Sequence, residues 1–309
     1  MEIQTKVASV VPFFLGSLYA IYRFESFSFK NFMLMFISLI CIDMATTGIN
    51  NYIDYKKAII TEGFNYESHN AIVRDKLKEV NVVVTILSLI AIAAVFGVLL
   101  FLNTDYVVLL LGMLSFAIGV LYSFGPVPIS RTPLGEIFSG FTMGFIILFL
   151  SVYIHVFTGD LVGLHFAEGI FAISLNVKEI LFIFLISITT ISGIANIMLA
   201  NNLCDIEDDR ENRRYTLPIY IGRENGLKLF KWLYYISYID IVILILLGVE
   251  PITAALVLLT FIPLRNNIRV FYNEQSKEKT FILAVKNFLL LNGSHIVALA
   301  VGISIRAIF

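Results

Sequence analysis

Charged residues are scarce in this chain: only 15% of its 309 residues are Asp, Glu, Lys or Arg, and 58% are hydrophobic. A soluble globular domain typically carries about 25% charged and 45–50% apolar residues. This composition excludes an ordinary water-soluble domain and indicates an integral membrane protein. The net charge is −1 and no long basic tract is present, so nothing in the sequence favours a nucleic-acid partner.

Cysteine and histidine are also rare, with two and four residues in the chain. Cys41 and Cys204 lack the spacing of a disulfide framework or a metal site, so we interpret them as packing residues. The histidines show no metal-ligand spacing either, which argues against zinc or iron. Any metal site is therefore expected to use oxygen ligands.

Apolar runs recur along the chain at about the 20 residues that a helix needs to cross a bilayer. We predict an all-α integral membrane protein with about nine transmembrane helices in one bundle, a single domain over residues 1–309, and cytoplasmic cap loops. Helices are expected because each one satisfies its own backbone polar groups within lipid. The predicted spans are 7–22, 31–49, 81–102, 106–124, 137–158, 179–200, 229–249, 252–272 and 283–305.

Lys and Arg predict the orientation of these spans. If the N-terminus lies inside, the inner loops hold 18 of the 22 Lys and Arg residues, and the outer loops hold only Arg23, Lys30, Lys178 and Arg306. Cytoplasmic loops carry such an excess of positive charge. We therefore expect a bacterial-type cell membrane protein with a cytoplasmic N-terminus and an outside C-terminus.

One pattern, Asn-Asn-x-x-Asp, occurs twice, each time at the end of an apolar run. The first copy is Asn50-Asn51-Tyr52-Ile53-Asp54, and the second begins the acidic stretch from Asn201 to Arg214. Four predicted spans separate the copies, and an even number returns the chain to the same side of the membrane. We therefore expect the two motifs to meet at the cytoplasmic end.

Acidic residues in these motifs repeat at helical spacing. If the second motif continues its helix, Asp205 and Asp209 are four residues apart and Asp208 is three from Asp205, so all three carboxylates share one face. In the first motif, Asn50 and Asp54 have the same relation. Like charges at this spacing repel, and a divalent cation removes the conflict.

Mg²⁺ suits such oxygen ligands, because it is commonly held by one or two carboxylates together with substrate phosphate oxygens. Basic residues near the motifs would bind phosphate directly; they are Lys56, Lys57, Arg74, Arg210, Arg213 and Arg214. The motifs therefore predict a metal–diphosphate site, with the rest of a lipid substrate lying in the bundle. Solvated loop charges are the alternative interpretation of either motif alone.

A third stretch, Leu121 to Glu136, connects two predicted spans on the same side. It contains Gly125-Pro126 and further prolines, which are typical of a rigid turn. It also carries one tyrosine, one arginine and one carboxylate.

Together these three stretches resemble the UbiA-type intramembrane aromatic prenyltransferases, and within them the branch that prenylates 1,4-dihydroxy-2-naphthoate in menaquinone synthesis. The matching residues are Asn50, Tyr52, Asp54, Tyr122, Gly125-Pro126, Pro128, Leu134-Gly135-Glu136, Asn201-Asn202, Asp205, Asp209, Thr216-Leu217 and Gly222, with Arg214 at a lysine position. Two departures fall in the first motif: Asn51 replaces an aspartate, and Ala58 stands where another aspartate is common.

The resemblance implies Mg²⁺-dependent transfer of a polyprenyl group from an allylic polyprenyl diphosphate to the naphthoate, with loss of CO₂. It implies the following roles: metal ligands Asp54, Asp205, Asp208 and Asp209; diphosphate contacts Asn50, Asn51, Arg74, Asn201, Asn202 and Arg214; and Tyr122 beside the reacting carbon. Another aromatic acceptor, such as 4-hydroxybenzoate, stays open. A secondary transporter is a different class, but its polar site would be expected near mid-membrane rather than at one end.

Overall fold

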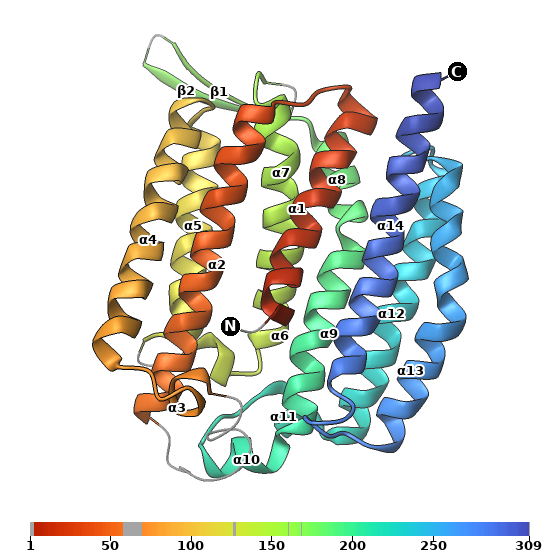
Figure 1. The fold of residues 1–309 in the computed structure, drawn as a ribbon. Helices are drawn as coiled ribbons and strands as arrows, with labels where there is room; N and C mark the ends of the chain where they lie inside the picture. Colours follow the sequence, from red (N-terminus) through yellow and green to blue (C-terminus); the bar gives the residue numbers. More distant parts are fainter. Residues whose placement is uncertain (1–2, 58–69, 126–127, 160, 168, 309) are drawn as a thin grey trace.

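Long helices that run side by side form one bundle (Figure 1). The computed structural model describes residues 3–57, 70–125, 128–159, 161–167 and 169–308. This architecture confirms the expected helical membrane fold.

The helices that correspond to the predicted spans are, in chain order, α1 (Ile3–Phe24), α2 (Phe29–Lys57), α4 (Glu79–Leu102), α5 (Tyr106–Ser123), the continuous α6 (Gly135–Ser139), η3 (Gly140–Ile146) and α7 (Ile147–Val156), the pair α8 (Val177–Ile186) and α9 (Ile188–Cys204), α12 (Arg223–Leu246), η4 (Ile252–Thr260) with α13 (Phe261–Asn273), and α14 (Ile282–Ile308). The shorter helices are α3 (Ala71–Arg74), η2 (Ile129–Arg131), α10 (Ile206–Glu211) and α11 (Leu217–Ile221).

The number of spans is less clear-cut than the nine that the sequence predicts. Within the described residues, seven helical stretches are long and apolar enough to cross a membrane alone. Helices α8 and α9, which meet at a 44° bend, make an eighth if the pair is counted as one broken span. The apolar part of α5, Tyr106–Tyr122, is shorter than the others. At 1.5 Å per residue it reaches about 26 Å, slightly less than the hydrocarbon thickness of about 30 Å.

A β-hairpin departs from the all-α expectation. Strands β1 (Val162–Ala167) and β2 (Ile170–Leu175) pair antiparallel, with Val162 opposite Leu175. Gly169 lies in the turn with φ +79°, a left-handed conformation that glycine adopts at little cost. We call this the hairpin end, and we call the opposite end, which carries α3, α10 and α11, the motif end (Figure 1).

Close packing fixes the position of α9, the helix that leads into the second motif. A Cβ on Gly144 of η3 would lie 2.6 Å from the Cα of Ile191, so only glycine allows this approach. The Thr190 hydroxyl donates a hydrogen bond to the Gly144 carbonyl at 2.9 Å. Small residues at helix contacts are typical of membrane bundles. Close packing against η3 therefore holds in place the helix that leads into the second motif.

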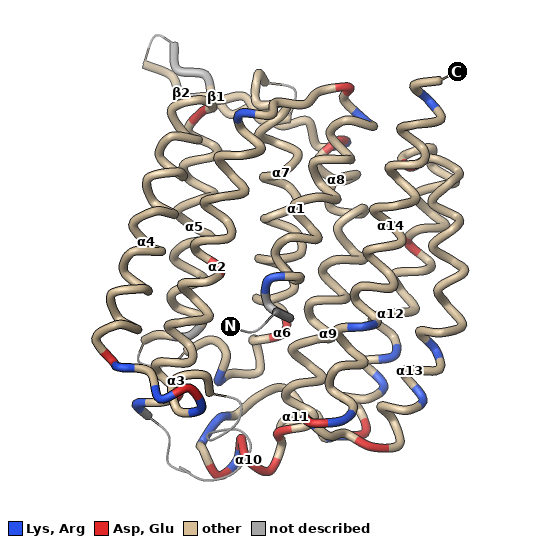
Figure 2. Tube along the Cα trace, in the orientation of Figure 1, with Lys and Arg blue, Asp and Glu red and all other residues tan. Residues whose placement is uncertain are grey.

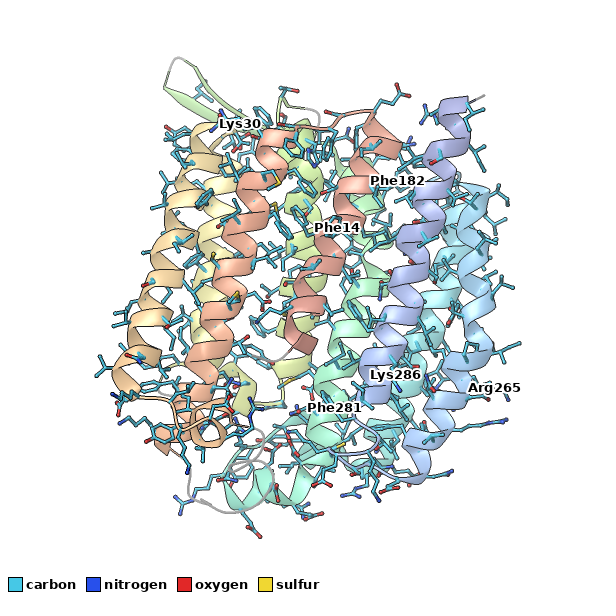
Figure 3. The ribbon with its side chains drawn as sticks, in the orientation of Figure 1. Phe14, Lys30, Phe182, Arg265, Phe281 and Lys286 are labelled. Atoms are coloured by element: carbon cyan, nitrogen blue, oxygen red, sulfur yellow. The ribbon has the colours of Figure 1, made fainter. Side chains whose placement is uncertain are left out.

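Charged residues gather mainly at the motif end, and fewer lie at the hairpin end or along the helices (Figure 2). In the side-chain view, Lys30 lies at the hairpin end and Phe281 lies toward the motif end (Figure 3). The functional residues that the sequence predicts therefore share one end of the bundle.

Candidate active site

An ion pair joins the first Asn-Asn-x-x-Asp motif to the end of the acidic stretch that the second motif begins. The Nη2 atom of Arg214 lies 3.4 Å from Oδ1 of Asp54, although the two residues are 160 positions apart in the chain. Arg131 from the Gly/Pro-rich connection approaches the same oxygen at 3.8 Å. This geometry confirms that the two motifs meet, and it adds the third stretch to the same site.

A helix-terminating turn places Arg214 between the motifs. Arg213 has φ 55°, and the Arg214 N–H donates to the Asp209 carbonyl at 2.8 Å. This is the arrangement that commonly ends helices, although glycine is usual at the left-handed residue and another residue there costs about 1 kcal/mol. The Tyr215 N–H then donates to the Arg131 carbonyl at 3.1 Å, which ties the turn to the connection.

The second motif lies at a break between two helices, not in one continuous helix as expected. Helix α9 ends at Cys204 and α10 begins at Ile206, with Asp205 between them. The Asp209 N–H still donates to the Asp205 carbonyl at 2.7 Å, so the four-residue relation survives the break. The Asp205 and Asp209 residues are only 8% and 4% exposed, whereas Asp208 is exposed on α10. The buried acidic pair is therefore Asp205 and Asp209.

These two buried carboxylates have different partners. Lys277, from the connection between α13 and α14, forms a hydrogen-bonded ion pair with Oδ2 of Asp205. The Thr216 hydroxyl donates to Oδ2 of Asp209 at 3.1 Å. Burial raises the pKa of Asp209 to about 6, against the opposing effect of Arg214, and the charge of Asp205 adds to the rise. A further cation beside this pair would relieve that unfavourable burial of negative charge.

Two arginines of the site offer the opposite chemistry. Burial and the nearby Arg214 charge lower the pKa of Arg131. The Nε atom of Arg214 is buried and has no hydrogen-bond partner among the described residues. Buried N–H groups are normally paired, and guanidinium groups bind phosphate oxygens well. These two arginines therefore offer donors to an anion with several oxygens.

The middle connection lies behind these charges. Asn202 donates from Nδ2 to Oε1 of Glu136 at 2.8 Å, and both residues are buried. Tyr122 lies in the last turn of α5, where the middle connection begins. Tyr122 therefore lies beside the site, whereas the Asn202 side chain binds the middle connection in this structure.

Two residues with predicted diphosphate contacts point elsewhere. The side-chain amide of Asn51 donates to the backbone carbonyl of Thr47 at 3.2 Å, and the backbone carbonyl of Asn51 accepts from Asn70 at 2.8 Å. Asn51 also borders a cavity of about 220 Å³ between α2, α3 and α4. The guanidinium of Arg74 binds its neighbour Asp75 at 2.8 Å. Asn50 and Asn201 are half-buried on α2 and α9, and Ala58 lies outside the described residues.

Residues 9–292 of this sequence match the UbiA prenyltransferase family. The chain belongs to the UbiA prenyltransferase family. A 1,4-dihydroxy-2-naphthoate octaprenyltransferase from Bacillus subtilis (strain 168) is 31% identical over 245 residues, which cover 79% of this chain and 72% of that protein. The resemblance that the motifs predict is thereby confirmed at the level of the family.

Solved UbiA structures share the fold. A UbiA homologue from Aeropyrum pernix K1, solved without ligand, superimposes with a TM-score of 0.72 at 17% identity over 96% of this chain and 98% of that one. A UbiA homologue from Archaeoglobus fulgidus, bound to DMAPP and Mg²⁺, gives a TM-score of 0.61 at 13% identity over 97% and 98% of the two chains. The protein is therefore a membrane-embedded prenyltransferase with the UbiA fold.

The donor set of this UbiA-family site fits Mg²⁺ better than a soft metal. Within the described residues, no group of three or more His, Cys, Asp or Glu side chains could hold a metal ion by itself. Mg²⁺ commonly takes only one or two protein carboxylates and completes its shell with water and substrate phosphate. The buried pair Asp205 and Asp209 provides those two carboxylates, so the residues fit this ion.

Sequence reasoning missed three residues of the site. Arg131 carried a signal, since it is the one arginine in the Gly/Pro-rich connection. Thr216 was matched only as part of a motif, and its bond to Asp209 was not foreseen. Lys277 carried no signal, because it is one of two lysines in its connection and only the fold brings it to Asp205.

Proposed function

We propose that this UbiA-family protein transfers a polyprenyl group from an allylic polyprenyl diphosphate to 1,4-dihydroxy-2-naphthoate, with loss of CO₂, giving demethylmenaquinol. The observation that carries this proposal is the combination of buried acids and convergent arginines: Asp205 and Asp209 are buried, and Arg131 and Arg214 both approach Asp54. Such an arrangement suits a metal-bound diphosphate. The naphthoate is taken from the name of the Bacillus subtilis relative.

Asp205 and Asp209 would hold Mg²⁺, and Asp54 with Asn50 would hold a second ion or the diphosphate itself. When bound, Mg²⁺ supplies positive charge that stabilises the leaving diphosphate. The Archaeoglobus fulgidus homologue, which is bound to DMAPP and Mg²⁺, supports this assignment. Arg214 would bind diphosphate oxygens through its buried, unpaired Nε, and Arg131 would assist it.

In the reaction that we infer, the allylic carbon–oxygen bond breaks and its electron pair leaves with the diphosphate. The two arginines stabilise that developing charge because they are already oriented before reaction. A ring carbon of the naphthoate then forms a bond to the allylic cation, and CO₂ and a proton are lost as the ring becomes aromatic again. Tyr122 would lie near the reacting carbon, and the apolar bundle would keep water away from the cation.

The motif end would face the cytoplasm and the C-terminus the outside. The excess of Lys and Arg in the predicted inner loops supports this orientation, as does the gathering of charge at the motif end (Figure 2). A cytoplasmic opening would admit both the polar diphosphate and the aromatic acid.

One experiment tests this function. The purified protein is incubated with Mg²⁺, a labelled polyprenyl diphosphate and a panel of aromatic acids, and the lipid products are identified by mass spectrometry. We expect prenylated, decarboxylated naphthoquinol with 1,4-dihydroxy-2-naphthoate and none without Mg²⁺. Product with 4-hydroxybenzoate alone would change the acceptor, and no released diphosphate with any acid would contradict prenyl transfer.

A further inference from the structure

Lys277 reaches the acidic pair from a part of the chain that contains neither motif. It lies in the connection between α13 and α14, and its ammonium binds Oδ2 of Asp205. The two side chains are only 16% and 10% exposed. A built-in cation therefore occupies the carboxylate to which we assign Mg²⁺.

Local hydrogen bonds hold this connection in a defined shape. The Thr280 hydroxyl donates to the Glu274 carbonyl at 2.9 Å and accepts from the Ser276 N–H at 2.9 Å. Phe281 follows at the motif end (Figure 3), and it is buried in the same hydrophobic cluster as Leu203 and Ile206, which flank Asp205. Shared packing thus connects the backbone around Lys277 to the backbone around Asp205.

Lys277 and Mg²⁺ cannot both stay close to one carboxylate without repelling each other. A lysine ammonium is a compact charge on a flexible four-carbon chain, so it can turn to another anion while its backbone stays in place. In the loaded site the substrate diphosphate, which carries several negative charges, would offer such an anion.

We propose that Lys277 neutralises Asp205 in the metal-free enzyme and moves to the diphosphate when Mg²⁺ takes that carboxylate. This inference rests on the function proposed above and assigns a further residue to its diphosphate site. Lys277 opposes the metal when no diphosphate is present and assists diphosphate binding once the metal is bound. Because coupling between two ligands is reciprocal, metal and diphosphate then favour each other's binding.

The test uses two binding measurements on the purified full-length protein. Mn²⁺ alone is titrated by electron paramagnetic resonance, and labelled inorganic diphosphate is titrated by equilibrium dialysis at saturating Mg²⁺. For Lys277→Gln we expect Mn²⁺ to bind at least about fivefold tighter and diphosphate at least about fivefold weaker, at the lower end of common coupling factors. The opposite signs matter, because mere damage to the fold would weaken both.

Lys279→Gln is the matched control. Lys279 belongs to the same connection, but it is 69% exposed and pairs with Glu274 at 3.2 Å. Both affinities of this variant are expected to match those of the parent protein. Equal changes in Lys279→Gln and Lys277→Gln would overturn the assignment to Lys277. The assignment also fails if Lys277→Gln weakens the binding of both ligands or of neither.

Asp205→Asn separates this inference from the proposed function. If Asp205→Asn binds Mn²⁺ and diphosphate like the parent protein, the metal assignment itself is wrong. If Asp205→Asn loses Mn²⁺ binding while Lys277→Gln shows parental affinities, the metal assignment stands and only the role of Lys277 is refuted.

Discussion

The two Asn-Asn-x-x-Asp motifs share a pattern but differ in their surroundings. The first lies within the unbroken helix α2, where Asp54 is 37% exposed and faces two arginines. The second lies at a helix break, where Asp205 and Asp209 are buried beside one lysine and one hydroxyl. In the first motif two arginines face one carboxylate, whereas in the second one lysine faces two carboxylates. A bound cation would therefore stabilise the carboxylates of the second motif more than that of the first.

Packing around the motifs explains this difference. Helix α9 contacts α12 and α14, and the connection carrying Lys277 covers the end of α9. Helix α2 packs mainly along α4, and among the described residues Asp54 near its end is 37% exposed. A carboxylate loses more hydration in the enclosed position, and its interactions with cations are correspondingly stronger there.

Asp205→Asn should have the largest effect. It removes a buried charge assigned to the metal while keeping the side-chain size, and we expect Mg²⁺-dependent transfer to fall by about 10²-fold or more. Initial rates of labelled prenyl transfer measure this. Glu207→Gln is the control, since that acid is 72% exposed two residues further on. An Asp205→Asn variant that keeps a tenth of the activity would remove the distinction between the motifs.

Asp54→Asn should have a smaller effect, a loss of about fivefold. Arg131 and Arg214 already neutralise this acid, and ion pairs as exposed as these contribute about 1 kcal/mol or less. The same transfer assay measures the loss. Glu79→Gln serves as control, because Glu79 pairs with Lys56 on the exposed surface. A loss equal to that of Asp205→Asn would show that both motifs hold metal equally.

Arg214→Lys tests the contact between the motifs. Lysine keeps the charge but lacks the planar guanidinium, which binds Asp54 through Nη2 and leaves Nε unpaired. We therefore expect KM for the prenyl diphosphate to rise about fivefold, with a smaller change in kcat. Steady-state kinetics separate the two constants. Arg210→Lys, at a 60% exposed site, should leave both unchanged. An unchanged KM in Arg214→Lys would exclude Arg214 from diphosphate binding.

Thr216→Val should have the smallest effect. It removes the hydroxyl that donates to Asp209 and leaves that buried acid with one fewer partner, at a cost of about 1 kcal/mol in metal-free stability. Thermal unfolding in detergent without divalent cations measures the cost. Thr216→Ser keeps the donor and should restore the melting temperature. Equal melting temperatures for valine and serine would show that this hydrogen bond contributes nothing.

The long helices followed from local composition. The predicted span 81–102 matches α4 at Glu79–Leu102, because hydrophobicity along the chain alone decides which segments enter lipid. The hairpin was missed, since its pairing of Val162 with Leu175 depends on hydrogen bonds between separate segments. The break at Asp205 was missed for a similar reason: helical spacing continues through the motif, and the bend depends on what packs around it.

By itself, the sequence determined that the protein lies in a membrane, that it carries two matching acidic motifs on one side, and that its chemistry resembles prenyl transfer. Composition and repeated spacing carry that information locally. Tertiary structure alone decided which acids are buried, that Arg131 and Arg214 meet at Asp54, and that Lys277 reaches Asp205. Burial and ion pairing depend on distances between residues far apart in the chain, and only the packed bundle fixes those distances.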